Sequence, residues 1–261
     1  MDFEGVVLDL DGTVYRGGEP TPGAAETIGR LRERGCRILF CSNNPTKGRE
    51  AYVERLAGMG ITATADEVLS AGTVTTQYLV DHHADDLLYV VGSSGLREQL
   101  ADAPVDLRTT DDPEAGEVLV VSFYRGFDYD TLREAYYAGR DGCPFVGSDP
   151  DVVVPTEERM VPGSGAIIGS VASILEREPD HVLGKPSAEA VEMAREALGV
   201  PPNRCLMVGD RLDTDIAFGE RAGMTTALVR TGVNGDADVA EHDVTPDHVL
   251  DSIADVERLF E

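Results

Sequence analysis

Short apolar runs alternate with amphipathic segments along this chain, and most of the apolar runs end in a polar turn. Uninterrupted apolar runs predict strands over residues 6–8, 37–41, 68–70, 88–92, 118–123, 152–154, 204–209 and 225–229. Apolar residues at helical spacing predict helices over residues 22–34, 47–58, 72–82, 131–138, 166–177, 213–222 and 250–259. Strands that alternate with helices are typical of an α/β fold with a parallel sheet. We therefore predict an α/β protein whose central strands are buried on both faces.

The same pattern predicts two domains. The first and last stretches of the chain end their strands in acid-rich turns, whereas the middle stretch does not. A chain of 261 residues suits one large domain with an insert, or two modest domains. We therefore expect a core built from residues 1–77 and 180–261, with a smaller α/β domain inserted at residues 78–179.

The most informative run is Val-Val-Leu-Asp-Leu-Asp-Gly-Thr at residues 6–13. Asp9 and Asp11 come at the end of an apolar strand, and positions i and i+2 of a strand share one side. The carboxyl end of a strand is where open α/β sheets bind ligands. Two nearby acids favour a bound cation or a shared proton. The octet is thus compatible with a metal site or an acid/base pair, or with a solvated Asp-Gly turn.

Two further polar turns suit an anion. Ser42-Asn43-Asn44 follows the predicted strand 37–41, and its hydroxyl, amides and backbone N–H groups could hold a phosphate. It is equally compatible with ordinary turn chemistry. Lys185 lies in the loop Gly-Lys-Pro-Ser at residues 184–187 and is one of two lysines in the chain, the other being Lys47. This scarcity distinguishes Lys185 from a solvated loop lysine.

A last acidic turn follows the strand at 204–209. Asp210, Asp213 and Asp215 come in quick succession before a predicted helix. Carboxylates in such positions cap a helix or stabilise its first turn, and for Asp213 we favour this capping role. Asp210 and Asp215 are also candidates for a site, because they repeat the strand-then-acid pattern of Asp9.

The charge balance narrows the function classes. The chain has 22 basic and 48 acidic residues, which gives a net charge of −26. A surface so acidic repels nucleic acids and anionic membranes, so we expect neither as a partner. The scattered acids and the near absence of lysine resemble proteins of salt-loving archaea, so we also expect a halophilic protein.

Cysteine usage and terminal sequence argue for a cytoplasmic enzyme. The four cysteines, at 36, 41, 143 and 205, form no Cys-x-x-Cys pair, so we expect neither a zinc site nor a disulfide framework. The amino terminus has no basic segment followed by an apolar one, so we expect no signal peptide. No apolar run is long enough to span a membrane.

Taken together, the four polar turns resemble the motifs of the haloacid dehalogenase superfamily, whose phosphohydrolases use an aspartate nucleophile. Asp9-x-Asp11-Gly-Thr matches the first motif, Ser42 the second, Lys185 the third, and Gly209-Asp210 with Asp215 the fourth. Longer strings are similar to the NagD-like, p-nitrophenyl-phosphatase-type branch; they lie at 42–44, 162–167, 184–186 and 209–216. The resemblance covers essentially the whole chain. It implies a Rossmann-like parallel core flanked by helices, with a large α/β cap inserted between the second and third motifs.

This resemblance also implies roles for individual residues. Asp9 would be the nucleophile, and Asp11 would protonate the leaving group and later deprotonate water. Mg²⁺ would be held by the carboxylates of Asp9 and Asp210 and by the backbone carbonyl of Asp11. Asp215 would act from behind these ligands or through water.

Phosphate oxygens would be bound by Ser42 and Lys185, with Asn43 steadying the phosphate loop. The substrate would be a small phosphorylated metabolite such as a sugar phosphate, nucleotide, glycerol phosphate or phosphoglycolate. Two other functions stay open: a phosphotransferase or mutase, and a non-catalytic phosphate-binding regulatory module. The acid at position 11 argues against a dehalogenase. Family behaviour provides a precedent for a homodimer through the cap.

Three other features carry less weight. Many members of the family read Ala-Thr-Asn-Pro-Asp where this chain reads Gly-Ser-Asp-Pro-Asp at 147–151, so no single member's substrate can be transferred to it. The glycines of 163–169 resemble a dinucleotide fingerprint, but no long strand precedes them, and we expect a turn into a helix. The five histidines lack ligand spacing on a common helix, and His82 and His83 are expected at the surface.

Overall fold

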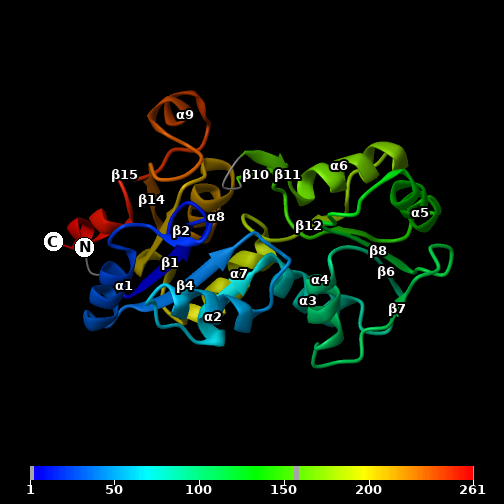
Figure 1. Ribbon diagram of the computed structural model, residues 1–261, viewed down its shortest axis with the longest axis horizontal. Coiled ribbons are helices and arrows are strands. Elements are labelled where there is room, and N and C mark those ends of the chain that lie inside the picture. The colour runs from blue at the N-terminus through cyan, green and yellow to red at the C-terminus, as the bar shows by residue number, and fades with distance from the viewer. Residues whose placement is uncertain (1–2, 156–158, 261) are drawn as a thin grey trace. The chain divides into compact units, whose positions relative to one another are not determined.

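The computed structural model describes residues 3–155 and 159–260, which divide into two compact units (Figure 1). The core unit comprises residues up to 42, residues 49–69 and residues from 185 onward. The insert unit comprises residues 43–48 and 70–184. The insert unit therefore contains all of residues 78–179, together with residues 43–48, 70–77 and 180–184.

A six-stranded sheet forms the centre of the core unit, with strand order β15-β14-β13-β1-β4-β5. Its strands are β1 (Gly5–Asp9), β4 (Arg37–Ser42), β5 (Val68–Ser70), β13 (Cys205–Gly209), β14 (Thr225–Val229) and β15 (His248–Leu250). The neighbours from β15 through β4 pair in parallel. This arrangement confirms the predicted α/β fold, and it places β1 between the two strands, β13 and β4, that carry the other polar turns.

Both faces of this sheet are covered, which explains the unbroken apolar runs of its strands. Val6 and Leu8 of β1 are fully buried in a cluster that also contains Ile28 of α1 (Ala24–Glu33) and Leu56 of α2 (Arg49–Gly58). On the opposite face, Gly219 of α8 (Ala217–Ala222) lies so close to Met207 that a side chain at 219 would meet it. Close packing on both faces holds the strand ends in fixed positions.

Several predicted helices of the core unit have different bounds or character. The predicted helix 213–222 is a π-helical turn, Leu212–Ile216, followed by α8. The predicted last helix is β15 followed by a 3₁₀ helix, Ile253–Phe260. Sequence reasoning missed α7 (Ala188–Leu198), although Ser187 caps it by accepting a hydrogen bond from the Ala190 backbone N–H. The remaining elements are the short hairpin β2 (Tyr15–Arg16) and β3 (Glu19–Pro20), α9 (Asp236–Glu241), and 3₁₀ turns at Ala65–Glu67 and Pro202–Arg204.

The insert unit is a second α/β unit. Its five-stranded sheet has the order β12-β9-β8-β6-β7, with parallel pairing throughout. The strands are β6 (Leu88–Val91), β7 (Thr109–Thr110), β8 (Val118–Val121), β9 (Phe145–Gly147) and β12 (His181–Val182). The helices are α3 (Ala71–His82), α4 (Ser94–Ala101), α5 (Tyr129–Gly139) and α6 (Ser164–Leu175). An antiparallel pair, β10 (Val153–Pro155) and β11 (Met160–Pro162), completes the unit.

The glycines of 163–169 and the side chains of His82 and His83, to which no role in the site was given, lie mostly as predicted. Residues 163–165 lead from the three-residue strand β11 into α6. His82 is exposed, whereas His83 is only partly exposed because it pairs with Asp86 and lies near the ring of Tyr78. Over residues 3–155 and 159–260, no helix is both long and apolar enough to cross a bilayer.

Candidate active site

Three neighbouring strands of the core sheet end in the predicted site residues. Asp9 is the last residue of β1, Ser42 the last residue of β4, and Asp210 follows directly after β13. In the β1–β4 register, Asp9 lies opposite Cys41, so Ser42 is one residue beyond it. Because parallel strands end at the same edge of a sheet, these residues share the ligand-binding edge typical of α/β folds.

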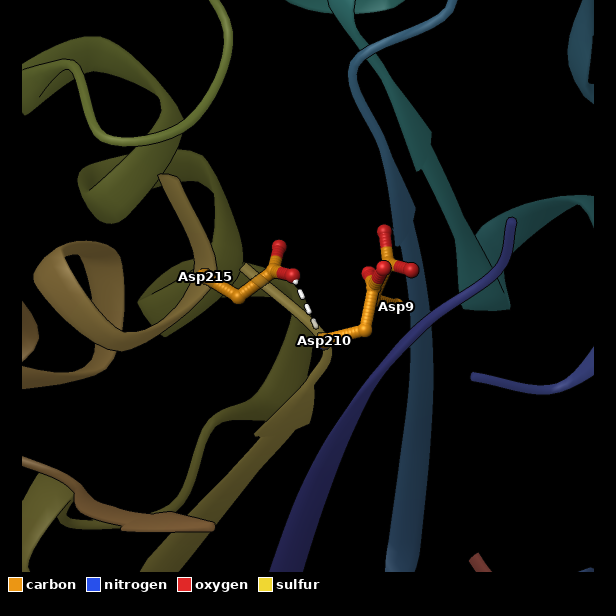
Figure 2. A group of neighbouring side chains, drawn as sticks. All are labelled: Asp9, Asp210 and Asp215. Atoms are coloured by element: carbon orange, nitrogen blue, oxygen red, sulfur yellow. Dashed lines mark hydrogen bonds between the residues drawn. The ribbon is translucent and has the colours of Figure 1, made fainter. Parts of the chain in front are cut away.

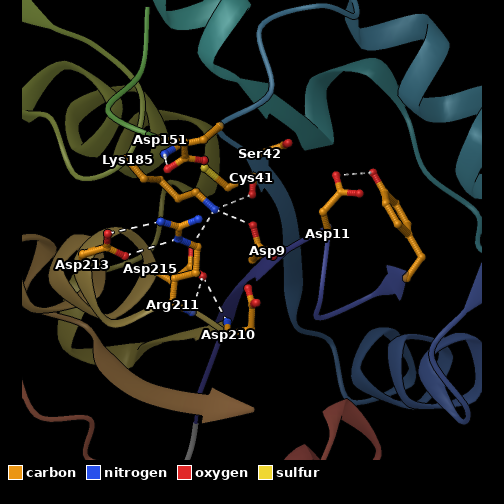
Figure 3. A network of polar contacts seen from close by, with 12 residues as sticks. Asp9, Asp11, Cys41, Ser42, Asp151, Lys185, Asp210, Arg211, Asp213 and Asp215 are labelled. Carbon is orange, nitrogen blue, oxygen red and sulfur yellow. Dashed lines mark hydrogen bonds and ion pairs between the residues drawn. The ribbon is translucent and has the colours of Figure 1, made fainter. Parts of the chain in front are cut away.

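Three carboxylates meet at this edge. Asp9, Asp210 and Asp215 each offer an oxygen atom within 4.8 Å of the others, and all three residues are buried (Figure 2). Asp11 is not part of this group, because β1 ends at Asp9 and the strand alternation expected for the pair does not continue. Figure 3 shows that the carboxyl group of Asp11 points away from Lys185, the partner of Asp9.

Lys185 supplies the positive charge among these acids. Its Nζ atom lies 2.7 Å from Oδ1 of Asp9 and 2.7 Å from Oδ1 of Asp215, and it donates to the Cys41 carbonyl at 2.9 Å (Figure 3). Only 2% of the Lys185 side chain is exposed. Burial lowers the pKa of Lys185, but the carboxylates of Asp215 and Asp9 outweigh burial, and the net shift is upward. The amine is therefore held as a cation.

The pKa values of the carboxyl groups are raised as well, which for an acid favours the neutral form. Burial, and then the charge of Asp215, raise the pKa of Asp9 well above its ordinary value despite the opposing effect of Lys185. Burial and the charge of Asp215 likewise raise the pKa of Asp210 to about 7. Three acids beside one lysine leave excess negative charge, so the site favours either protons or a cation.

Two buried carboxylate oxygens indicate a cation site. Oδ2 of Asp9 and Oδ1 of Asp210 are buried and accept no hydrogen bond from the described residues. Buried oxygens without donors are costly unless something else satisfies them. Carboxylate oxygens are the ligands that Mg²⁺ prefers, so the donor set fits the metal that the resemblance to the family implies.

Backbone groups hold the other oxygens in place. Oδ2 of Asp215 accepts hydrogen bonds from the backbone N–H groups of Asp210 and Arg211, both at 3.0 Å. Oδ2 of Asp210 accepts from the Val233 backbone N–H at 2.7 Å. Val233 is a contact that sequence reasoning missed, because backbone donors carry no residue signature.

The predicted capping role of Asp213 is wrong. Asp213 is exposed, and its carboxylate accepts hydrogen bonds from the side chain of Arg211 at 3.3 and 3.2 Å (Figure 3). The loop forms a π-helical turn, Leu212–Ile216. The backbone N–H groups of Asp210 and Arg211, just before this turn, donate to Asp215 and not to Asp213. The structure shows that Asp215 faces the site, as the sequence motif implied, and that Asp213 faces outward without capping the turn.

Ser42 and Asn43 have different surroundings. Ser42 is buried at the end of β4, where its hydroxyl lies 3.4 Å from the hydroxyl of Tyr52 on α2. Asn43 belongs to the insert unit, where its amide donates to Oδ1 of Asp151 at 3.3 Å. Asp151 is the last residue of the Gly-Ser-Asp-Pro-Asp segment at 147–151.

Comparisons with known proteins agree with this geometry. A family model for haloacid dehalogenase-like hydrolases matches residues 6–106, and a second model for HAD-like hydrolases matches residues 182–256. The chain is 34% identical to a sugar-phosphatase, AraL, of Bacillus subtilis, over 98% of this chain and 93% of the relative. It is 31% identical to a 5′-nucleotidase, YutF, of the same organism, over 97% of each chain.

Solved structures give the same result. The p-nitrophenyl phosphatase from Archaeoglobus fulgidus superposes with a TM-score of 0.92 at 32% identity, covering 99% of this chain and 100% of that one. A 4-nitrophenylphosphatase from Thermotoga maritima superposes with a TM-score of 0.90 at 30% identity, covering 98% and 97%. The chain therefore belongs to the haloacid dehalogenase-like hydrolases, as a phosphatase of their NagD-like branch.

Proposed function

We propose that this protein is a Mg²⁺-dependent phosphomonoesterase that forms an aspartyl-phosphate on Asp9. The observation that supports this most directly is the environment of Asp9. One of its oxygens is held by Lys185, while the other is buried without a donor among the described residues. A carboxylate is a weak nucleophile, but it attacks phosphorus effectively when the phosphoryl group is positioned and its charge is neutralised.

Asp9 and Asp210 would hold Mg²⁺ through their free carboxylate oxygens, and Asp11 through its backbone carbonyl. Asp215 would act indirectly, since one of its oxygens is engaged by Lys185 and the other by two backbone N–H groups. When bound, Mg²⁺ would neutralise the negative charge of the phosphate, which these acids would otherwise repel.

In the reaction, an oxygen of Asp9 forms a bond to phosphorus while the bond between phosphorus and the ester oxygen breaks. Asp11 gives its proton to the departing oxygen. Asp11, now ionised, then removes a proton from the water that hydrolyses the aspartyl-phosphate. Inorganic phosphate leaves, and both acids return to their starting states.

Phosphate oxygens would be bound by the amine of Lys185, the hydroxyl of Ser42 and the amide of Asn43. Lys185 would have two functions, because the same amine that pairs with Asp9 and Asp215 can neutralise an incoming phosphate. Asp215 would keep that amine in place.

For the substrate we propose a small phosphorylated metabolite: a sugar phosphate, nucleotide, glycerol phosphate or phosphoglycolate. The names of the relatives, a sugar-phosphatase and a 5′-nucleotidase, support this class without choosing within it. Residues 78–179 would set the choice as a cap domain. We further propose a halophilic enzyme, on the basis of its charge of −26. A cytoplasmic location and a homodimer formed through the cap are also part of the proposal, the dimer on the precedent of the family.

The test uses purified protein with p-nitrophenyl phosphate, with and without Mg²⁺, at low and at high salt. We expect turnover only with Mg²⁺, and no turnover by Asp9→Asn. Full activity of Asp9→Asn would refute the assigned nucleophile. Transfer of the phosphoryl group to an added sugar in place of water would indicate a phosphotransferase, and phosphate binding without any turnover would indicate a regulatory module.

A further inference from the structure

The turn after β1 and the helix α2 each place a side chain beside the carboxyl group of Asp11. The chain folds back directly after β1, with backbone N–H groups of Val14 and Tyr15 both donating to the Leu10 carbonyl. This turn brings the Tyr15 hydroxyl to 3.4 Å from Oδ2 of Asp11. Tyr15 is fully buried, so its ring holds the hydroxyl in one place.

Arg55 of α2 approaches the same carboxyl group from another direction. A terminal nitrogen of its guanidinium lies 4.0 Å from Oδ1 of Asp11, so Asp11 has Arg55 near one oxygen and Tyr15 near the other. The guanidinium also stacks on the ring of Tyr15, with its central carbon 4.0 Å from the ring centroid. It donates to the Gly17 carbonyl as well, which ties α2 to the turn.

These contacts matter because Asp11 is the less restrained of the two motif acids. Its side chain is 42% exposed, whereas that of Asp9 is 10% exposed and paired with Lys185. A carboxyl group that must deliver a proton to one oxygen atom loses efficiency when it samples several rotamers. A stacked arginine and a buried tyrosine restrict that sampling.

We propose that Tyr15 and Arg55 are positioning residues that hold the Asp11 carboxyl group for proton transfer to the leaving oxygen. This inference rests on the proposed function, in which Asp11 is the general acid. The proton moves from the Asp11 carboxyl group to the ester oxygen as the bond from that oxygen to phosphorus breaks.

Leaving-group dependence tests this role. An alkoxide needs a proton to depart, whereas p-nitrophenolate departs without one, so a misplaced acid harms alkyl phosphates selectively. The measured quantity is kcat/KM, which covers only the steps up to the phosphorylated enzyme and is insensitive to its later hydrolysis. For Arg55→Met and Tyr15→Phe we expect kcat/KM on glycerol phosphate to fall at least ~10-fold more than on p-nitrophenyl phosphate.

The matched control is Arg34→Met. Arg34 also places its guanidinium over an aromatic ring of the core unit, that of Phe260 at 5.6 Å, but it does not contact Asp11. We expect the ratio of the two kcat/KM values to be unchanged in this variant. Tyr15→Phe retains the buried ring, so it keeps the test valid if Arg55→Met fails to fold.

Asp11→Asn separates this inference from the function on which it rests. Suppose that Asp11→Asn shows the selective loss, but that kcat/KM of the Tyr15 and Arg55 variants falls equally on both substrates. The positioning role is then overturned, while the assignment of Asp11 as the general acid stands. If Asp11→Asn itself shows no selectivity, the assigned acid is wrong and the inference falls with it. Selective loss in all three variants supports both.

Discussion

The Nζ atom of Lys185 lies 2.7 Å from Oδ1 of Asp9, although 176 positions separate the two residues in the chain. We expect Lys185→Met to lower kcat at least ~100-fold, because the variant loses the fixed charge that stabilises the transferring phosphoryl group. The variant also leaves three buried carboxylates without a cation. Its thermal midpoint should therefore rise more than that of the wild type when the pH falls from 8 to 6, because protons bound to these carboxylates replace the lost positive charge.

The control for Lys185→Met is Arg204→Met, which removes a half-exposed cation paired with Glu4. Surface pairs contribute little, so activity and the pH dependence of the thermal midpoint should match those of the wild type. Equal behaviour of the two variants would contradict the assigned role of Lys185. Kinetics with p-nitrophenyl phosphate and melting curves by circular dichroism measure both effects.

Binding of Mg²⁺ should depend on pH through Asp210. Burial, together with Asp215, raises the pKa of Asp210 to about 7, so below that pH a proton competes with the metal for the carboxylate. The affinity for Mg²⁺ should therefore rise as the pH increases through 7. Titration calorimetry at pH 6 and pH 8 measures this, and we expect at least ~3-fold tighter binding at pH 8.

Asp213 provides the matched control for that measurement. It lies in the same loop as Asp210, but its carboxylate is exposed and pairs with Arg211. Asp210→Asn should abolish detectable Mg²⁺ binding, whereas Asp213→Asn should leave it unchanged. Retention of Mg²⁺ binding by Asp210→Asn would place the metal elsewhere.

The central sheet was predictable because its strands are apolar on both faces. The strands at 68–70 and 225–229 have the predicted bounds, and the strand before Asp210 ends as expected. The first strand ends at Asp9, so the alternation expected to bring Asp11 to the same side does not continue. The ends of neighbouring parallel strands meet at one edge of a sheet, which made the acids and Ser42 candidates, and the resemblance to the family implied their roles.

Contacts between distant segments could not be predicted. The approach of Arg55 to Asp11 joins a helix and a turn, and neither residue's local pattern records it. The motif names Asp215 as a site residue, but the backbone N–H groups that hold its carboxylate lie at a π-helical turn, which has no distinct apolar periodicity. The helix α7 was a different failure: its buried Ala190, Ala194 and Leu198 have helical spacing and should have been recognised.

Gly12 should be essential for the geometry of the site. It has a φ of +102°, and a Cβ atom there would lie 2.5 Å from Oδ2 of Asp210. Gly12→Ala should therefore displace Asp210 and lower Mg²⁺-dependent kcat/KM at least ~10-fold. Gly35 is the matched control, because its φ is +86° but a Cβ atom there would meet nothing within 4 Å.

Both glycine variants should lose about 1 kcal/mol or more of stability, since each forces a side chain into the left-handed region. Only Gly12→Ala should lose activity. Chemical denaturation and steady-state kinetics on the two variants separate strain from displacement. Comparable kinetic losses in Gly35→Ala would mean that backbone strain, rather than contact with Asp210, causes the effect.

Salt should stabilise the fold. A net charge of −26 destabilises the compact state by self-repulsion, and added ions screen that repulsion. We expect the thermal midpoint to rise by several degrees between about 0.1 M and about 1 M KCl, where the Debye length falls from about 10 to about 3 Å. A midpoint that falls over this range would contradict a halophilic protein.

Asp149 should make the stability of the fold pH-dependent. It is 2% exposed, accepts a hydrogen bond from the Ser148 hydroxyl at 2.8 Å, and lies beside Asp151. Burial, followed by the charge of Asp151, raises the pKa of Asp149 from its ordinary value of 3.8 to about 7. The folded protein thus binds this proton more tightly than the unfolded chain does. The resulting stabilisation is complete below the unfolded pKa and is lost as the pH rises toward 7.

Asp149→Asn removes that titration while keeping a side chain of similar shape. Between pH 5 and pH 8 the wild type should lose at least about 1 kcal/mol more unfolding free energy than Asp149→Asn loses. Urea denaturation of both proteins at the two pH values measures the difference. Asp9 and Asp210 titrate in both proteins, so their contributions cancel in the comparison. Parallel pH dependences would show that Asp149 is ionised in the folded protein across this range.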